Sequence, residues 1–493
     1  MLFNSLHYLY FFVALFFLYF KAVPDRYRWL LLLLASCYFY MVYIPKFILI
    51  LFFLITVDYA LGLLIAKAEG SRRKWLLVIS IATNLSTLFF FKYFNFFNEN
   101  VAGLAHLIHW NYSPMLLQFA LPLGLSFHVF QSLSYVIEVY KGKQEPEKHY
   151  GIYALYVMFF PQLVAGPIER PQHLLHQFHE PHEFSAFKAR RGLELVVLGL
   201  FKKLVIADWI AQIITHVYAN IEGINGFTLL LAAILFTYQI YCDFSGYSDI
   251  AVGSALVFGY DLTRNFDRPF ASRSIAEFWR RWHISLSNWL KDYLYYPLAF
   301  AGKRVTKFRL YASLFITFTL IGLWHGANWT YVVFGMIHGM FLVFSTLSAP
   351  GRKKIREIIG LARVPKLERS WQIACSFMLV TASFIFFRSE SVAQALQVFR
   401  RIGEAFAHPR AYILHPKLII SFESLGMLPI RFLIICAFIV ILEYIQFIQA
   451  RKQTLFICED KKKYIRWMWY YGLTISILLF GYLGAESFIY FKF

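Results

Sequence analysis

His325 is the residue best suited to chemistry, and it lies in the sequence Gly-Leu-Trp-His-Gly at positions 322–326. Apolar stretches long enough to be membrane flank it on both sides, and an ionisable side chain at membrane depth is costly enough to indicate a functional site. The near-neutral pKa of imidazole suits a general base. Gly322 and Gly326 permit the close approach of another chain or of a ligand. A histidine hydrogen-bonded between two helices is the structural alternative, and the neighbouring motifs favour catalysis.

A second histidine, His283, follows the sequence Phe-Trp-Arg-Arg-Trp at 278–282 and could assist His325. The surrounding segment 264–309 interleaves Arg and Lys with Trp and Tyr. This pattern is typical of an interfacial helix with an aromatic belt. It also fits a cytoplasmic site for a phosphate-rich ligand, because the arginine fork binds phosphate through two hydrogen bonds. Both roles can hold together. The candidate ligand contacts are Arg280, Arg281, Trp282, Lys291 and Arg304.

A third motif, Asp-Phe-Ser-Gly-Tyr-Ser-Asp at 243–249, interrupts an apolar run with carboxylates and hydroxyls. We expect a polar network that ties helices together, with cavity lining as the less favoured interpretation. A Ser–His–Asp hydrolase is not supported, because the chain has no Gly-x-Ser-x-Gly elbow. The residues singled out for a structural or tunnel-lining role are Asp243, Ser245, Asp249, Trp324 and Asn328.

Four histidines, His173, His176, His179 and His182, recur at a spacing of three. On a helix they would share one face and could suggest a metal. Prolines bracket the run, and the spacing does not match the usual zinc patterns, so a solvated cytoplasmic surface helix is the preferred interpretation. The five cysteines also show no metal-ligand spacing. The sequence therefore predicts no metal site.

The composition indicates what kind of protein must position these residues. The chain has 493 residues, of which 59% are hydrophobic and only 15% charged, and its mean hydropathy is +0.54. Apolar runs recur from end to end, which predicts one integral membrane domain over 1–493 rather than several soluble domains. The net charge of +20 comes from Lys and Arg in short loops. That distribution indicates membrane topology rather than nucleic-acid binding.

Thirteen apolar runs are candidates for membrane helices, which need about 17–25 residues. They are 3–20, 29–44, 47–66, 75–94, 116–140, 151–168, 193–217, 227–259, 310–323, 330–346, 371–387, 431–447 and 467–485. The run 151–168 contains Pro161 and Gly166-Pro167. We predict that it is re-entrant, because broken backbone is tolerated at membrane depth only where protein or a cavity surrounds it. The expected fold is all-α and polytopic, with about 12 crossings in a range of 11–13.

Loop charges predict the orientation of these helices. Basic residues follow the first, third and fifth runs, and the later loops 264–309, 352–369 and 451–466 are also strongly basic. These loops are therefore predicted to be cytoplasmic, with both termini outside. The run 310–346 leaves from one basic loop and returns to another, so it should cross twice with 324–328 at the reversal.

Six motifs together resemble the membrane-bound O-acyltransferase family, and in particular its bacterial branch that contains alginate O-acetyltransferase. They lie between 161 and 340, with peripheral helices at 1–140 and 371–493. The motifs are Pro-Gln-Leu-Val-Ala-Gly-Pro-Ile at 161–168, Asp-Phe-Ser-Gly-Tyr-Ser-Asp at 243–249, Asn-Phe at 265–266, Phe-Trp-Arg-Arg-Trp-His-Ile-Ser-Leu-Ser at 278–287, Tyr-Leu-Tyr-Tyr-Pro at 293–297 and Gly-Leu-Trp-His-Gly at 322–326.

The resemblance implies a ring of helices around an outward funnel, with a narrow tunnel toward the cytoplasm. It implies that His325 is the catalytic histidine and His283 the second motif histidine. It also implies acetyl-coenzyme A as the cytoplasmic donor, with no permanently bound cofactor. The acceptor would be a periplasmic or extracellular polysaccharide, reached through a periplasmic SGNH-type acetyltransferase or a small membrane partner, at a bacterial inner membrane.

The C-terminal sequence Phe-Ile-Tyr-Phe-Lys-Phe at 488–493 resembles an aromatic motif that this branch links to acyl relay, which makes Tyr490 the relay candidate. An interfacial aromatic anchor is the alternative. Two other functions stay open. A transporter or flippase also uses broken helices and ionisable groups near the membrane midplane. A lipid or protein acyltransferase of the same superfamily would need a longer apolar tunnel.

Overall fold

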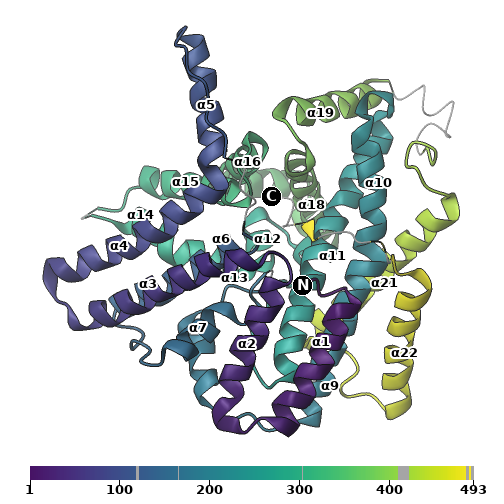
Figure 1. Ribbon diagram of the computed structural model, residues 1–493. Coiled ribbons are helices and arrows are strands. Elements are labelled where there is room, and N and C mark those ends of the chain that lie inside the picture. Colours follow the sequence, from purple (N-terminus) through teal and green to yellow (C-terminus); the bar gives the residue numbers. More distant parts are fainter. Residues whose placement is uncertain are drawn as a thin grey trace. The chain divides into compact units, whose positions relative to one another are not determined.

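The computed structural model describes residues 1–117, 122–164, 166–302, 304–408, 421–482, 484 and 488–489. The described residues form helices and connecting segments with no β-strand among them (Figure 1). The chain divides into two compact units. The first comprises Met1–Val196 and Tyr247–Arg264, and the second comprises Val197–Gly246 and Asn265–Phe493. The expectation of a single domain stays a prediction.

The first unit contains the N-terminal helices. They are α1 (Leu6–Phe17), α2 (Arg28–Met41), α3 (Ile48–Lys67), α4 (Gly70–Leu88), α5 (Phe94–Leu107), α6 (Leu125–Tyr140), α7 (Tyr150–Met158), α8 (Pro171–Leu174) and most of α9 (Ala186–Leu200). Figure 1 shows α3 and α4 side by side. Asp58 on α3 accepts hydrogen bonds from Ser80 (2.6 Å) and Asn84 (2.8 Å) on α4, so buried polar side chains join these two apolar helices.

The predicted interruption of the run 151–168 is confirmed. Helix α7 ends at Met158, and a turn follows from Phe159 to Val164 with Pro161 inside it. Pro161 has no backbone N–H and cannot continue a helical ladder. The turn is buried within the unit, with Phe159 and Phe160 completely enclosed. The irregular backbone is thus surrounded by protein, as membrane depth would require.

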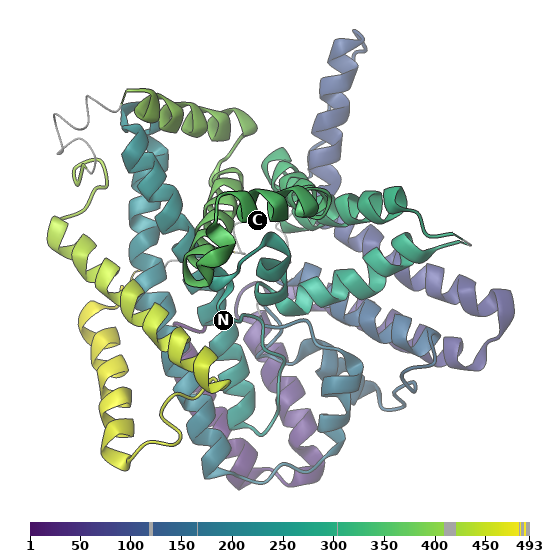
Figure 2. The ribbon, with the colours of Figure 1, turned by 180° about the vertical axis from the view of Figure 1, so that it is seen from behind.

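The second unit carries the histidine motifs. Its helices are α10 (Asp208–Ala219), α12 (Ile275–Arg281), α13 (Ile284–Leu290), α14 (Tyr296–Phe300), α15 (Lys307–His325), α16 (Trp329–Leu347), α17 (Ala349–Ile358), α18 (Pro365–Arg388), α19 (Val392–Ala407), α21 (Pro429–Lys452) and α22 (Lys463–Phe480). Figure 2 shows α21 and α22 next to each other. Both pack against a π-helical segment, Phe201–Ala207, that joins α9 to α10. The long helix α11 (Gly226–Val257) contributes to both units.

Seven helices in the described part of the chain are long and apolar enough to cross a membrane. They are Pro45–Lys67, Gly70–Leu107, Gly226–Val257, Lys307–His325, Trp329–Leu347, Pro365–Arg388 and Pro429–Lys452. Leu6–Ala22 is a shorter apolar helix. Each of the seven overlaps a predicted run, and the all-α, multi-pass class is confirmed. The predicted 12 crossings stay a prediction, because runs such as 29–44 and 116–140 form the shorter helices α2 and α6.

Candidate active site

The α15–α16 hairpin positions His325. The predicted reversal is confirmed, since α15 ends at His325 and α16 begins at Trp329. A Cβ atom on Gly322 would lie only 2.1 Å from the Tyr331 carbonyl oxygen, and one on Gly335 would lie 2.2 Å from the Phe318 carbonyl oxygen. The glycines therefore allow two helix backbones to touch. The chain that approaches Gly322 and Gly326 is α16 itself.

Asn328 fixes the start of the second helix of this hairpin. Its Oδ1 accepts a hydrogen bond from the Thr330 N–H at 2.9 Å, which caps α16. Its Nδ2 donates to the Glu390 carbonyl at 3.0 Å, beyond the end of α18. Asn328 therefore ties the reversal next to His325 to the segment between α18 and α19.

His325 is buried at the C-terminal end of α15, with 3% of its surface exposed. Its ring packs edge-on against Trp324 (centroids 5.1 Å apart), Phe387 on α18 (5.2 Å) and Phe334 on α16 (6.0 Å). These aromatic neighbours hold the imidazole in an environment of low polarity. Electrostatic and proton-transfer interactions are stronger there than in water.

Trp324 joins the two motif histidines. Its ring centroid lies 5.1 Å from that of His325 and 6.0 Å from that of His283, and both contacts are edge-on. The structure therefore places both predicted catalytic histidines around one buried indole, although 42 positions separate them in the sequence (325 − 283). This juxtaposition confirms that His283 and His325 belong to the same neighbourhood; their catalytic roles stay a prediction.

Asn265 orients His283. Its side-chain oxygen lies 3.2 Å from His283 Nδ1 and also accepts hydrogen bonds from the Ser285 N–H (3.2 Å) and the Ser285 hydroxyl (2.9 Å). Because an amide oxygen only accepts, Nδ1 carries the proton and Nε2 is the basic nitrogen. His283 has φ = +44°, a left-handed conformation that costs free energy for a residue with a side chain.

Burial keeps His283 uncharged. The side chain is completely enclosed, with Phe244 packed edge-on at 4.7 Å, and this burial lowers the pKa of the imidazole to about 3. At neutral pH the ring is therefore a neutral hydrogen-bond partner and proton acceptor. Asn265 was not predicted to be a site residue, and the Asn-Phe motif at 265–266 was the signal that could have identified it.

A buried ion-pair network surrounds Asp243. Lys203, on the π-helical segment, lies 2.7 Å from Asp243 Oδ1 and 2.8 Å from Asp208 Oδ1, and all three side chains are buried. Asp243 therefore takes part in a buried network of charged side chains, and its functional role stays a prediction. Lys203 was missed, although a lysine inside the apolar run 193–217 was a detectable signal because charge is costly there. Asp249 lies on the first-unit part of α11 and is half-buried, and Ser245 is fully buried one turn before it.

The C-terminal tail enters this network. The Ile489 N–H donates to Asp243 Oδ2 at 2.7 Å, and Phe488 is completely buried. The Phe488 ring packs 5.8 Å from Phe244, the same ring that contacts His283. Tyr490, the relay candidate, lies outside the described residues. Phe488 and Ile489, which precede it, are held inside the second unit beside the motif of α11.

The predicted donor contacts fall into two groups. Arg280, Lys291 and Arg304 are exposed on the segment 264–309. Arg281 is half-buried and pairs with Glu277 at 2.8 Å, and Trp282 is 2% exposed, packed against Phe266, Phe278 and other rings. The exposed group is available to a soluble ligand, whereas Arg281 and Trp282 are engaged in holding α12 in place.

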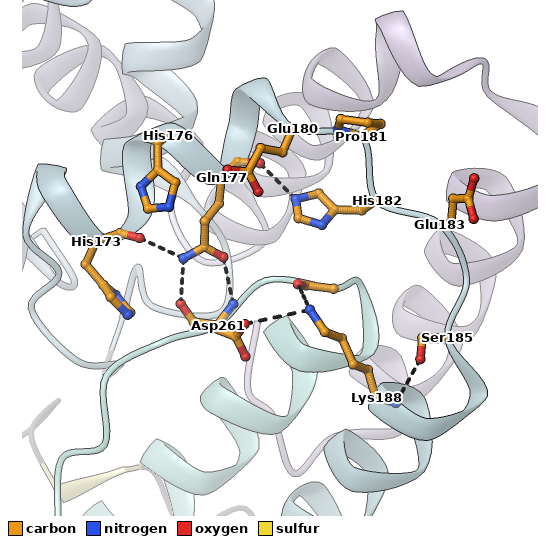
Figure 3. A pocket seen from close by; sticks show the side chains of 11 residues that line it. His173, His176, Gln177, Glu180, Pro181, His182, Glu183, Ser185, Lys188 and Asp261 are labelled. Atoms are coloured by element: carbon orange, nitrogen blue, oxygen red, sulfur yellow. Dashed lines mark hydrogen bonds and ion pairs between the residues drawn. The ribbon is translucent and has the colours of Figure 1, made fainter.

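The four regularly spaced histidines lie in the first unit and not in one helix. Positions 171–179 form α8 and a short 3₁₀ helix, and His182 follows in extended chain. Figure 3 shows three of them beside a polar pocket of about 500 Å³. His173 lies 2.7 Å from Glu169, and His179 lies 2.7 Å from Glu147. Among the described residues, no group of three His, Cys, Asp or Glu side chains could hold a metal.

Comparison with known proteins gives these residues a context. The sequence model of the membrane-bound O-acyltransferase family matches residues 149–357 of this chain. The probable alginate O-acetylase AlgI of Azotobacter vinelandii is 38% identical over 405 residues, covering 81% of this chain and 77% of that protein. A peptidoglycan O-acetyltransferase of Helicobacter pylori is 33% identical, covering 75% and 72%. A teichoic acid D-alanyltransferase of Streptococcus thermophilus is 28% identical, covering 54% and 68%.

Proposed function

Since the chain belongs to the membrane-bound O-acyltransferase family, we propose that it passes an acetyl group from cytoplasmic acetyl-coenzyme A across the membrane. The final acceptor is a cell-envelope polysaccharide, alginate or a similar polymer. An SGNH-type acetyltransferase or a small membrane protein outside receives the group. The protein lies in a bacterial inner membrane with both termini on the outer side.

One observation carries this proposal. His325, Trp324 and His283 form a continuous buried contact, and Phe244 joins His283 to the C-terminal tail at Phe488. The proposed base and Phe488, two positions before Tyr490, therefore lie in one neighbourhood of the second unit. Such positioning can lower a barrier by several kcal/mol, because the reacting groups no longer need to find each other.

The proposed reaction has two transfers. His325 removes the proton of an acceptor hydroxyl, that of Tyr490 or of a partner protein, and the oxygen attacks the thioester carbonyl carbon. The C–S bond breaks, and coenzyme A leaves as a thiolate that takes the proton from the imidazolium. A hydroxyl of the next acceptor then attacks the new ester and restores the first hydroxyl. His283, fixed by Asn265, offers its basic Nε2 to a donor hydroxyl of the substrate in the same site.

The donor approaches from the cytoplasmic side, on which the basic loops are predicted to lie. Its phosphates bind the exposed Arg280, Lys291 and Arg304, since guanidinium and ammonium groups complement phosphate charge. The separation of a cytoplasmic donor from an external polymer explains why the reaction uses a membrane-spanning protein.

The test uses the purified protein in lipid nanodiscs with acetyl-coenzyme A carrying a labelled acetyl group. We expect release of the free thiol of coenzyme A and, by peptide mass spectrometry, label on Tyr490. Tyr490→Phe should remove the label, and His325→Ala should abolish both label and thiol release. Thiol release without label on Tyr490, with Tyr490→Phe fully active, would replace the relay with transfer to another hydroxyl.

Two alternatives make different predictions in the same assay. A transporter or flippase cleaves no thioester, so wild-type protein supplied with partner and polymer would release no coenzyme A. An acyltransferase for long chains would use palmitoyl-coenzyme A faster than acetyl-coenzyme A. Either result would overturn the proposed substrate.

A further inference from the structure

The second unit contains a pocket of about 740 Å³. Neither His283 nor His325 lines it. It is bounded by α12, the C-terminal end of α16, the short helix α17 and the start of α18. The segments 264–309 and 352–369, which contribute to it, are the two basic loops that the charge rule predicted on the same side of the membrane. The sidedness of these loops stays a prediction.

One part of this pocket is strongly cationic. Arg273 and Arg280 come from the α12 side, and Arg352 and Arg356 come from α17. Arg273 pairs with Glu277 in the lining, and Arg356 pairs with Glu368 just outside it, so four guanidinium groups face two carboxylates and leave a net charge of +2 (4 − 2). Arg280 is exposed and has no ion-pair partner among the described residues. This part of the pocket suits a phosphate group.

The other part of the pocket is apolar and runs along two membrane-spanning helices. Phe341 and Phe344 line it from α16, and Trp371, Cys375 and Leu379 line it from α18. Phe344, Trp371 and Leu379 are 67%, 61% and 41% exposed. From Trp371 to Leu379 the wall extends about 12 Å along α18, at 1.5 Å per residue. An exposed apolar wall on a spanning helix faces the acyl chains of the bilayer.

Helix α17 places the cationic part at the membrane surface. Its sequence Ala-Pro-Gly-Arg-Lys-Lys-Ile-Arg-Glu-Ile combines four basic residues with isoleucines. Ile355, Ile358 and the following Ile359 are exposed. A short basic helix with exposed isoleucines that connects two spanning helices is typical of a helix lying in the headgroup region.

We propose that this pocket binds an anionic phospholipid of the leaflet on the basic side. The lipid phosphate lies at Arg352 and Arg356 on α17, so that Arg280 stays available to the donor phosphates, and an acyl chain lies along Phe341, Trp371 and Leu379. Basic pockets between spanning helices are suited to acidic headgroups. The exposed apolar wall distinguishes this occupant from coenzyme A, whose pantetheine and nucleotide would not need a lipid-facing surface. The lipid site is additional to the proposed transfer of acetyl groups and is not a step in it.

Two double variants on the same helix test the proposal. Arg352→Gln with Arg356→Gln removes two charges from the lining. Lys353→Gln with Lys354→Gln removes two charges from α17 outside the lining and is the matched control. Native mass spectrometry would measure retention of phosphatidylglycerol against phosphatidylcholine after delipidation. We expect the arginine variant to lose about tenfold or more in preference for phosphatidylglycerol, and the lysine variant to behave like wild type. Equal loss in both variants would show general surface attraction and overturn the site.

The wild-type protein offers a test that needs no substitution. Cys375 lines the pocket and is half-buried, whereas Cys436 on α21 is equally half-buried and lies outside it. We expect phosphatidylglycerol, and not phosphatidylcholine, to slow alkylation of Cys375 several-fold while Cys436 stays unaffected. If coenzyme A protects Cys375 and phosphatidylglycerol does not, the pocket belongs to the donor. If neither protects it, the lipid proposal is wrong.

Discussion

Histidines occur in two contrasting regions of this protein. In the second unit, His283 and His325 are buried, packed against aromatic rings, and joined through Trp324. In the first unit, His173 and His179 are exposed and lie 2.7 Å from the carboxylates of Glu169 and Glu147. The same side chain is therefore desolvated among aromatic rings in one region and solvated beside a carboxylate in the other.

The contrast shows which feature distinguishes a catalytic candidate. Four histidines at regular spacing look more suggestive in the sequence than two that are 42 positions apart. In the regular set, His173 and His179 contact two different carboxylates, those of Glu169 and Glu147. His283 and His325, by contrast, both pack against the Trp324 indole. Burial and shared neighbours, rather than the density of histidine in the sequence, identify the candidate active site.

The largest effect is expected from His325→Ala. Removing a general base usually costs about 10²–10⁴-fold in rate, so thiol release from acetyl-coenzyme A should become undetectable while the protein is still made and inserted. His176→Ala, in the exposed set, is the matched control and should retain wild-type activity. Polymer acetylation at the normal level in the His325 variant would remove the central claim of the proposed function.

A smaller effect is expected from Asn265→Ala, which removes the hydrogen-bond acceptor of His283 Nδ1. Either ring nitrogen could then carry the proton, and we expect activity to fall about 10–100-fold through loss of one orientation. Asn265→Asp keeps an acceptor oxygen and should restore much of the activity. Its negative charge would raise the pKa of His283, so its rate should fall at low pH where that of wild type does not. Equal loss in both variants, with no change in pH profile, would indicate a purely structural Asn265.

The smallest effect is expected from His173→Gln, which tests the exposed region through the stability of the fold. The Glu169 carboxylate raises the pKa of His173 above its ordinary value near 6.5. The ion pair therefore stabilises the folded state below about pH 6.5. This contribution is lost as the pH rises through the folded-state pKa of His173. His173 is 45% exposed, so solvent screening limits the contribution to below about 1 kcal/mol.

Thermal unfolding of wild type and His173→Gln in detergent would measure this difference. We expect a slightly lower midpoint for the variant at pH 6 and no difference at pH 9. The buried His283 has the opposite sign, because its lowered pKa favours the folded state above pH 6.5 and opposes it at lower pH. A larger loss for His173→Gln at pH 9 than at pH 6 would contradict the assignment of the ion pair.

Much of the fold follows from apolar run lengths and loop charges. The hairpin 310–346, the break near Pro161 and the membrane-spanning class were all predictable, because each depends on residues close together in the sequence. The residues that contact His283 and Asp243 were not predictable in this way. Asn265 meets His283 only when the segment after α11 folds against the segment between α12 and α13, and Lys203 meets Asp243 only when the π-helical segment packs against α11.

The sequence alone determined that this is a polytopic membrane protein, that His325 lies at a helix reversal, and that its motifs are those of a membrane-bound O-acyltransferase. Apolar length, turn residues and motif spacing are local properties, so they can be read without a structure. The tertiary structure decided which histidine nitrogen is basic, which aromatic ring joins the two histidines, and that the residues before Tyr490 are buried beside Asp243. These facts depend on contacts between distant segments, and side-chain packing in three dimensions determines them.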